Sequence, residues 1–116
     1  AIQGITIRDD LFDRYRGSED FIQKYIFPGG FLPSIYFMRN LIEKNKLKLL
    51  KINSYPDDYA KTLAVWRENF FKTWKNITPL GFDETFKRMW EFYLSYCEAG
   101  FKARNINLIQ CSMSNK

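Results

Sequence analysis

The chain has 116 residues, of which 46% are hydrophobic, 18% aromatic and 27% charged, and its formal net charge is +5. This length supports one domain or part of one, and these proportions are typical of a folded protein. The sequence contains no histidine, which excludes histidine-based catalysis and histidine metal ligands within these residues, and we expect no metal site.

The basic charge suits an anionic partner, either nucleic acid or phospholipid headgroups. No run of Lys or Arg favours nucleic acid, so we expect no nucleic-acid partner and a peripheral contact with an anionic membrane surface. Cys97 and Cys111 have neither metal-site spacing nor a disulfide framework, and we expect buried thiols. With no signal peptide and no apolar stretch of about 20 residues, we expect a cytoplasmic protein at the inner membrane face.

The first part of the chain predicts a strand followed by short helices. Residues 2–7, which contain three isoleucines, are typical of a buried strand, and we therefore expect a piece cut from a longer chain. Residues 9–16 indicate a short polar helix or turn. Ser18 is expected to begin a second short helix, which Pro28 and the two glycines after it would end.

The middle of the chain predicts a third helix and a second strand. Ser34 can cap a helix that reaches to about Asn45. Residues 46–53 alternate well enough for a strand, and the lysines at 44, 46, 48 and 51 indicate a solvated face.

Residues 54–77 carry the clearest helical period in the sequence. Ser54 is expected to cap this helix, and Pro56 fits its first turn. Five charged residues lie away from the apolar stripe: Lys61, Arg67, Glu68, Lys72 and Lys75. The stripe itself recurs every three or four residues and consists of Tyr59, Leu63, Trp66, Phe70 and Trp74.

The last part of the chain predicts one more helix and a final strand. Asp83 can cap the helix, and we assign its aromatic residues 86, 90, 93 and 101 to the core. Gly100 suggests a close backbone contact, and Asn105 is expected to end the helix in a left-handed conformation. Residues 106–113 indicate a strand, followed by a frayed tail.

The order of strand, helices, strand, two helices and strand is an α/β pattern. A parallel sheet needs neighbours and cover on both faces, so we expect more strands upstream and interpret residues 1–116 as a single partial domain.

Three long stretches of the sequence resemble the cyclopropane-fatty-acyl-phospholipid synthases and the mycolic acid cyclopropane synthases. The stretches occur in the family's order and cover nearly the whole chain. They are FIQKYIFPGGFLPS (21–34), SYPDDYAKTLAVWRENF (54–70) and GFDETFKRMWEFYLSYCEAGFKARNINLIQ (81–110).

The resemblance implies the C-terminal part of a Rossmann-like methyltransferase fold that binds S-adenosylmethionine. Residues 2–8, 46–53 and 106–113 would be the fifth, sixth and seventh strands, with the last strand antiparallel and inserted between the other two. Residues 9–45 would cover the acyl-chain site. The cofactor loop would lie mostly upstream, so we expect no cofactor-binding residue here.

The resemblance also implies electrophilic methyl transfer to the cis double bond of an unsaturated phospholipid acyl chain, with bound bicarbonate as the base that allows ring closure. Tyr59 falls on the family's bicarbonate-binding tyrosine, and Phe27 falls on an aromatic residue that lines the acyl site. Gln3 replaces a histidine ligand of the bicarbonate. A glutamine amide still donates a hydrogen bond but adds no charge, which leaves open either ring closure or a methylated, unclosed product.

Two functions therefore stay open. One is a fragment of such an enzyme, inactive alone, with an exposed first strand that could form a homodimer or a strand-swapped oligomer. The other is a free-standing, basic and aromatic-rich module that binds lipid or an anion.

Overall fold

The computed structural model describes residues 1–116, which form three strands and several helices. The elements in chain order are β1 (Ile2–Ile7), α1 (Asp9–Arg16), the π-helical turn η1 (Ile22–Ile26), α2 (Ile35–Lys44), β2 (Leu47–Ser54), α3 (Pro56–Ile77), the 3₁₀ turn η2 (Thr78–Leu80), α4 (Glu84–Lys102) and β3 (Ile106–Asn115). The predicted α/β pattern is confirmed.

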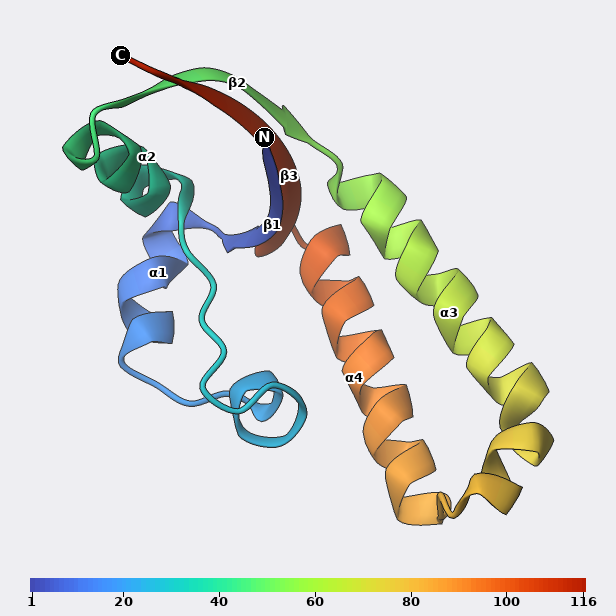
Figure 1. The fold of residues 1–116 in the computed structure, drawn as a ribbon. Coiled ribbons are helices and arrows are strands. Elements are labelled where there is room, and N and C mark those ends of the chain that lie inside the picture. Colours follow the sequence, from blue (N-terminus) through green and yellow to red (C-terminus); the bar gives the residue numbers. More distant parts are fainter.

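The last strand lies in the middle of the sheet (Figure 1). β3 pairs antiparallel with β1 on one side and with β2 on the other, as predicted. The register places Gln3 opposite Gln110 and Gln110 opposite Asn53. β1 is therefore an edge strand, and its outer side makes a single parallel bridge, between Ile7 and Ser34.

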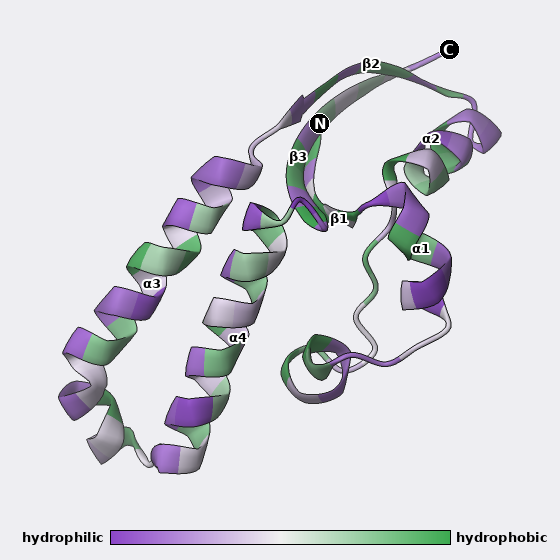
Figure 2. Ribbon diagram, turned by 180° about the vertical axis from the view of Figure 1, so that it is seen from behind, coloured by the Kyte–Doolittle hydropathy of each residue, from purple (hydrophilic) through white to green (hydrophobic).

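Helices α3 and α4 run side by side as a long hairpin that extends away from the sheet (Figure 1). Hydrophobic and hydrophilic residues alternate along both helices (Figure 2), as expected where one face of each is buried. The seam between them is the main core of the molecule. It is formed by residues that are at most 3% exposed: Ala60, Leu63, Leu94 and Phe101.

Two of the predicted helix caps are confirmed. The Ser34 hydroxyl accepts a hydrogen bond from the Phe37 amide at 3.1 Å, and the Asp83 carboxylate accepts one from the Phe86 amide at 2.9 Å. Each satisfies a backbone donor that the first helical turn leaves free.

The other two predicted caps are wrong. Ser54 ends β2, and its hydroxyl accepts a hydrogen bond from the Asn107 side chain at 3.0 Å, because pairing with β3 continues up to that residue. Ser18 lies outside the next helical turn. Asp20 caps that turn instead, since its carboxylate accepts from the Gln23 amide at 2.9 Å while the Gln23 side chain accepts from the Asp20 amide at 3.0 Å.

The end of the chain also differs from the prediction. Arg104, rather than Asn105, has the left-handed conformation, with φ 61°, and its guanidinium bonds the Asp57 carboxylate at 2.8 Å. The tail is not frayed, because β3 extends to Asn115, which pairs with Leu47.

Gly100 allows α4 to pack closely against the start of β3, as its position in the sequence suggested. A Cβ atom at residue 100 would lie 3.1 Å from two side-chain carbons of Ile106.

We therefore expect Gly100→Val to destabilise the full-length protein by about 1–3 kcal/mol through overpacking. Thermal unfolding measures this loss. Gly17→Ala is the control, because its added Cβ would meet the nearest atom at an ordinary 3.6 Å. Equal melting temperatures for the two variants would contradict the close contact.

Candidate functional site

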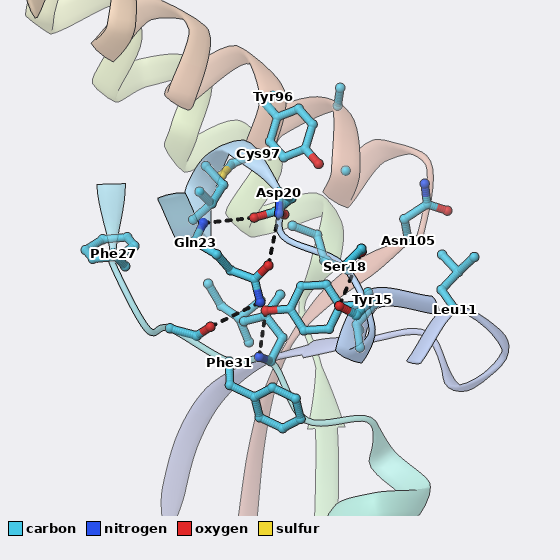
Figure 3. Close-up of a pocket in the computed structure, with 18 of the residues that line it drawn as sticks. Leu11, Tyr15, Ser18, Asp20, Gln23, Phe27, Phe31, Tyr96, Cys97 and Asn105 are labelled. Atoms are coloured by element: carbon cyan, nitrogen blue, oxygen red, sulfur yellow. Dashed lines mark hydrogen bonds between the residues drawn. The ribbon is translucent and has the colours of Figure 1, made fainter. Parts of the chain in front are cut away.

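A cavity of about 650 Å³ lies between α4 and the segment that runs from α1 to the start of α2 (Figure 3). Fourteen of its 21 lining residues are hydrophobic. Ile5, Ile7 and Ile106 line it from the sheet, and Tyr93, Cys97 and Gly100 line it from α4. A concave, mainly apolar site with few polar groups is typical of a pocket for a small ligand or an acyl chain.

Hydrogen bonds fix the wall of the cavity that faces α4. The Leu32 amide donates to the Tyr15 hydroxyl at 3.0 Å, and the Gln23 side chain donates to the Gly30 carbonyl at 3.2 Å. These bonds tie η1 and the loop after it to α1, so that an irregular segment forms a defined surface (Figure 3).

Phe27 lines this cavity, because a tight turn holds it there. The Gly30 amide donates to the Phe27 carbonyl at 2.8 Å, with Pro28 and Gly29 as the central residues and Gly29 at φ 77°. Gly30 cannot carry a side chain without a shift, since a Cβ would lie 2.9 Å from the Phe27 carbonyl oxygen. The Phe27 ring stands nearly perpendicular to the Tyr93 ring, with centroids 6.1 Å apart.

The part that α4 plays in the cavity was not predicted from the sequence. Phe101 is fully buried core, as expected, but Tyr93 also lines the cavity. Cys111 is buried, whereas Cys97 is only half-buried and faces the cavity. The spacing of Tyr93, Cys97 and Gly100 at i, i+4 and i+7 was the available signal, because it places them on one helix face.

Burial shifts the pKa values of two polar groups on this α4 face further from neutral pH. It raises the pKa of Tyr93 to about 12 and the pKa of Cys97 to about 11, with nearby ionisable groups adding to both shifts. The hydroxyl and the thiol therefore stay protonated at neutral pH. The carboxylate of Asp20 also lines the cavity, near the Tyr96 hydroxyl.

Tyr59 is not one of the residues that line the cavity. Its ring contacts that of Phe101, with centroids 4.8 Å apart, and it packs on the same core as Tyr93 and Cys97. Burial raises its pKa above the usual value, with Cys97 adding to the shift, so the phenol is a donor at neutral pH. No group of the chain hydrogen-bonds to its hydroxyl, and that oxygen is not one of the buried, unsatisfied atoms.

Gln3 lies on the exposed part of β1, outside the cavity. It shares a face of the sheet with Ile5, which lines the cavity, because side chains two residues apart on a strand point the same way. The Gln110 side-chain nitrogen donates to the Gln3 oxygen at 2.8 Å. This bond occupies the acceptor of the Gln3 amide and leaves its NH₂ group free to donate. The structure thus places Phe27 in the cavity and Tyr59 and Gln3 outside it.

Two further properties concern the whole chain. The 116 described residues contain no group of three or more Cys, Asp or Glu side chains arranged to hold a metal ion. None of the helices has both the length and the apolar character that crossing a bilayer requires.

Comparisons with known proteins identify the family. The family model described as mycolic acid cyclopropane synthetase matches residues 1–111. The chain is 40% identical over 114 residues to the tuberculostearic acid methyltransferase UfaA1 of Mycobacterium tuberculosis, covering 97% of this chain and 27% of that protein. It is 36% identical over 96 residues to the cyclopropane-fatty-acyl-phospholipid synthase of Escherichia coli K12, covering 83% of this chain and 25% of that protein. The chain thus spans about a quarter of the length of these relatives.

Solved structures share the fold. The cyclopropane synthase MmaA2 from Mycobacterium tuberculosis matches 96% of this chain and 42% of its own, with a TM-score of 0.82 and 23% identity. The mycolic acid cyclopropane synthase CmaA1, solved in complex with SAH and CTAB, matches the same shares with a TM-score of 0.81 and 25% identity. The three-stranded sheet and its helices thus correspond to the C-terminal part of these methyltransferases. We conclude that this chain belongs to the mycolic acid cyclopropane synthetase family.

Proposed function

We propose that the chain supplies the acyl-chain chamber and part of the active site of an S-adenosylmethionine-dependent enzyme that converts a cis double bond of an unsaturated phospholipid acyl chain to a cyclopropane ring. The observation that carries this proposal is the apolar cavity in a chain that belongs to this family, with Tyr59 packed on the same core as the cavity residues Tyr93 and Cys97. Residues 1–116 alone would not catalyse the reaction, because they contain no glycine-rich loop for the cofactor.

The lining of the cavity suits an acyl chain. Isoleucine side chains and the Phe27 and Tyr93 rings present hydrocarbon surface, and the ionisable Tyr93 and Cys97 groups are neutral. Burial of a hydrocarbon chain against such a surface is favourable in proportion to the area removed from water. Aromatic faces also stabilise positive charge that develops on a nearby carbon.

Tyr59 and Gln3 have hydrogen-bond donors that fit a small anion. The Tyr59 hydroxyl has no partner in the chain, and Gln110 leaves the Gln3 NH₂ group free. Both groups are neutral, so they hold an anion by directed hydrogen bonds without an opposing charge. In the proposed reaction the cofactor would supply an electrophilic methyl group to the double bond. A bicarbonate held by these donors would be the base that removes a proton from the transferred methyl group.

A second product is possible from the same methyl transfer. Gln3 adds no positive charge to the anion site, and the UfaA1 relative is named as a methyltransferase. A weakly held base favours proton loss elsewhere in the chain of the substrate, which gives a methyl-branched alkene in place of the ring.

The full-length protein tests the function. It should transfer label from the methyl group of S-adenosylmethionine into phospholipid that has a cis-unsaturated acyl chain, and not into saturated phospholipid. Mild catalytic hydrogenation of the product followed by mass spectrometry separates the outcomes, because an alkene takes up hydrogen and a cyclopropane ring does not. Label that never enters the lipid would overturn the proposal and favour a free-standing binding module.

Tyr59→Phe tests the anion site. The substitution removes a donor that the fold does not use, so we expect kcat of the full-length enzyme to fall roughly 10²-fold, while stability changes by less than about 0.5 kcal/mol. Tyr36→Phe is the control, since Tyr36 is an exposed tyrosine on α2. Labelled-lipid assays and thermal unfolding measure both effects. Wild-type turnover in Tyr59→Phe would remove this residue from the site.

Alkylation of Cys97 tests whether the cavity is the acyl-chain site. A pKa of about 11 means that the thiolate fraction of Cys97 at pH 8 is roughly a hundredfold below that of an ordinary cysteine. We expect slow alkylation by a small maleimide, faster alkylation as the pH rises toward that pKa, and protection by unsaturated phospholipid. Peptide mass mapping follows Cys97, with the buried Cys111 as the control that reacts only after unfolding. Lipid that gives no protection would place the acyl chain elsewhere.

A further inference from the structure

Glu98 is the one charged residue that is buried in the described chain, with 6% exposure. It occupies the face of α4 that packs on α3, in line with the buried Leu94 and Phe101 at spacings of four and three residues. A carboxylate therefore takes a position in the seam between the helices where the pattern predicts an apolar side chain.

Arg67 is the partner that comes from α3. Its guanidinium lies 2.9 Å from Glu98 Oε2, as an ion-pair contact without hydrogen-bond geometry, and donates to the Ser95 hydroxyl at 3.1 Å. The other oxygen of Glu98 accepts from Lys102, one turn further along α4. Arg67 follows Ala60 and Leu63 along the inner face of α3, although its charge suggested an outer position. The guanidinium thus joins α3 to two neighbouring turns of α4.

Stability does not explain why such a pair is present. Only Glu98 is buried, since the Arg67 side chain is 36% exposed. Removing the Glu98 carboxylate from water costs about as much as its attraction to the guanidinium returns, and an apolar pair of similar size is often as stable. The best-attested role of buried polar groups is to fix the register of packed helices. Pairing of β2 with β3 fixes the end of the hairpin next to the sheet. Further along, large apolar residues recur on both helices and the hydrophobic effect is not directional, so apolar packing alone does not fix the register there.

The register of this hairpin sets the position of Tyr59. The Tyr59 ring contacts Phe101 of α4 at 4.8 Å and Trp66 of its own helix at 5.9 Å. Phe101 is three residues after Glu98, and Trp66 directly precedes Arg67. A shift of α3 along α4 would carry the Tyr59 hydroxyl away from the cavity, and a displacement of about 1 Å is enough to lower a rate roughly 10²-fold.

We propose that Arg67 and Glu98 are a positioning pair, which fixes the register of α3 against α4 and thereby holds the Tyr59 hydroxyl at its place beside the cavity. Neither residue touches the substrate. The inference rests on the function proposed above, because it assigns Tyr59 to the reaction.

The test replaces both members at once in the full-length enzyme. Arg67→Met combined with Glu98→Leu keeps the volume of the two side chains and removes their charges and their directional polar contacts. We expect an unchanged or raised Tm, KM for lipid within about twofold, and kcat lower by roughly tenfold or more. The control is Glu68→Gln with Lys72→Gln, an exposed pair within α3 that does not reach α4, and it should leave kcat unchanged. Full kcat in the Arg67/Glu98 double variant would overturn the proposal.

A double-mutant cycle that includes Tyr59→Phe tests whether the Arg67–Glu98 pair acts through Tyr59. In the Tyr59→Phe background the double substitution should cause no further loss of kcat, whereas losses that multiply would overturn the proposal. If the double variant does not fold, Arg67→Lys serves instead. It keeps the charge but loses the planar two-point contact, and it should lower kcat severalfold with Tm retained. Full kcat in Arg67→Lys would then overturn the proposal.

A readout without substrate separates this inference from the proposed function. Hydrogen–deuterium exchange of the amides at residues 57–63 should be faster in the Arg67/Glu98 double variant, or in Arg67→Lys, than in the wild type and the Glu68/Lys72 control. Unchanged exchange would overturn the register role even if the enzyme acts on lipid. Wild-type enzyme that puts no label into lipid would defeat the proposed function, and the exchange result would still decide the register.

Discussion

The close packing of α3 on α4 is the constraint on which the rest of this structure depends. Four residues that are at most 3% exposed fill the seam, and the sheet joins it through Ile5 and Leu108. Because the hairpin extends well beyond the sheet, β-pairing alone cannot hold the two helices together along their length. Their relative position comes from side chains in the seam, where an aliphatic and aromatic core supplies the attraction. Two ion pairs also link α3 to α4 and to the residue that follows it closely, Arg67 with Glu98 and Asp57 with Arg104.

This packing gives α4 two different faces, and the candidate site follows from the difference. One face is buried against α3, while the face of Tyr93, Cys97 and Gly100 lines a cavity that η1 and its loop close from the other side. Tyr59 comes from α3, and its ring packs edge-to-face with Phe101 of α4, with centroids 4.8 Å apart. The site therefore combines residues from both halves of the chain, and each half is held by its own hydrogen bonds or core contacts.

Family motifs made much of the fold predictable. The YAKTL and IFPGG stretches carried the resemblance, and from it the central, antiparallel position of the last strand could be predicted and is confirmed. Helix ends were less predictable, because a serine or asparagine near a boundary has only a local preference for a capping position. Strand pairing or another long-range contact can override this preference. Ser54 shows this, since β3 keeps it in a strand. Arg104 shows it again, because a long-range bond to Asp57 accompanies its left-handed backbone.

The sequence by itself determined the alternation of strands and helices, the apolar stripes of both long helices and the turn that carries Phe27, because each depends on neighbours within a few residues. Only the tertiary structure decided that Tyr93 and Cys97 face a cavity, that Gln110 orients Gln3, and that Arg67 turns inward to a buried Glu98. These outcomes depend on which faces meet between residues that are far apart in the chain, by 107 positions for Gln3 and Gln110. Periodicity defines a face of a helix or strand, but not the partner that the face will meet.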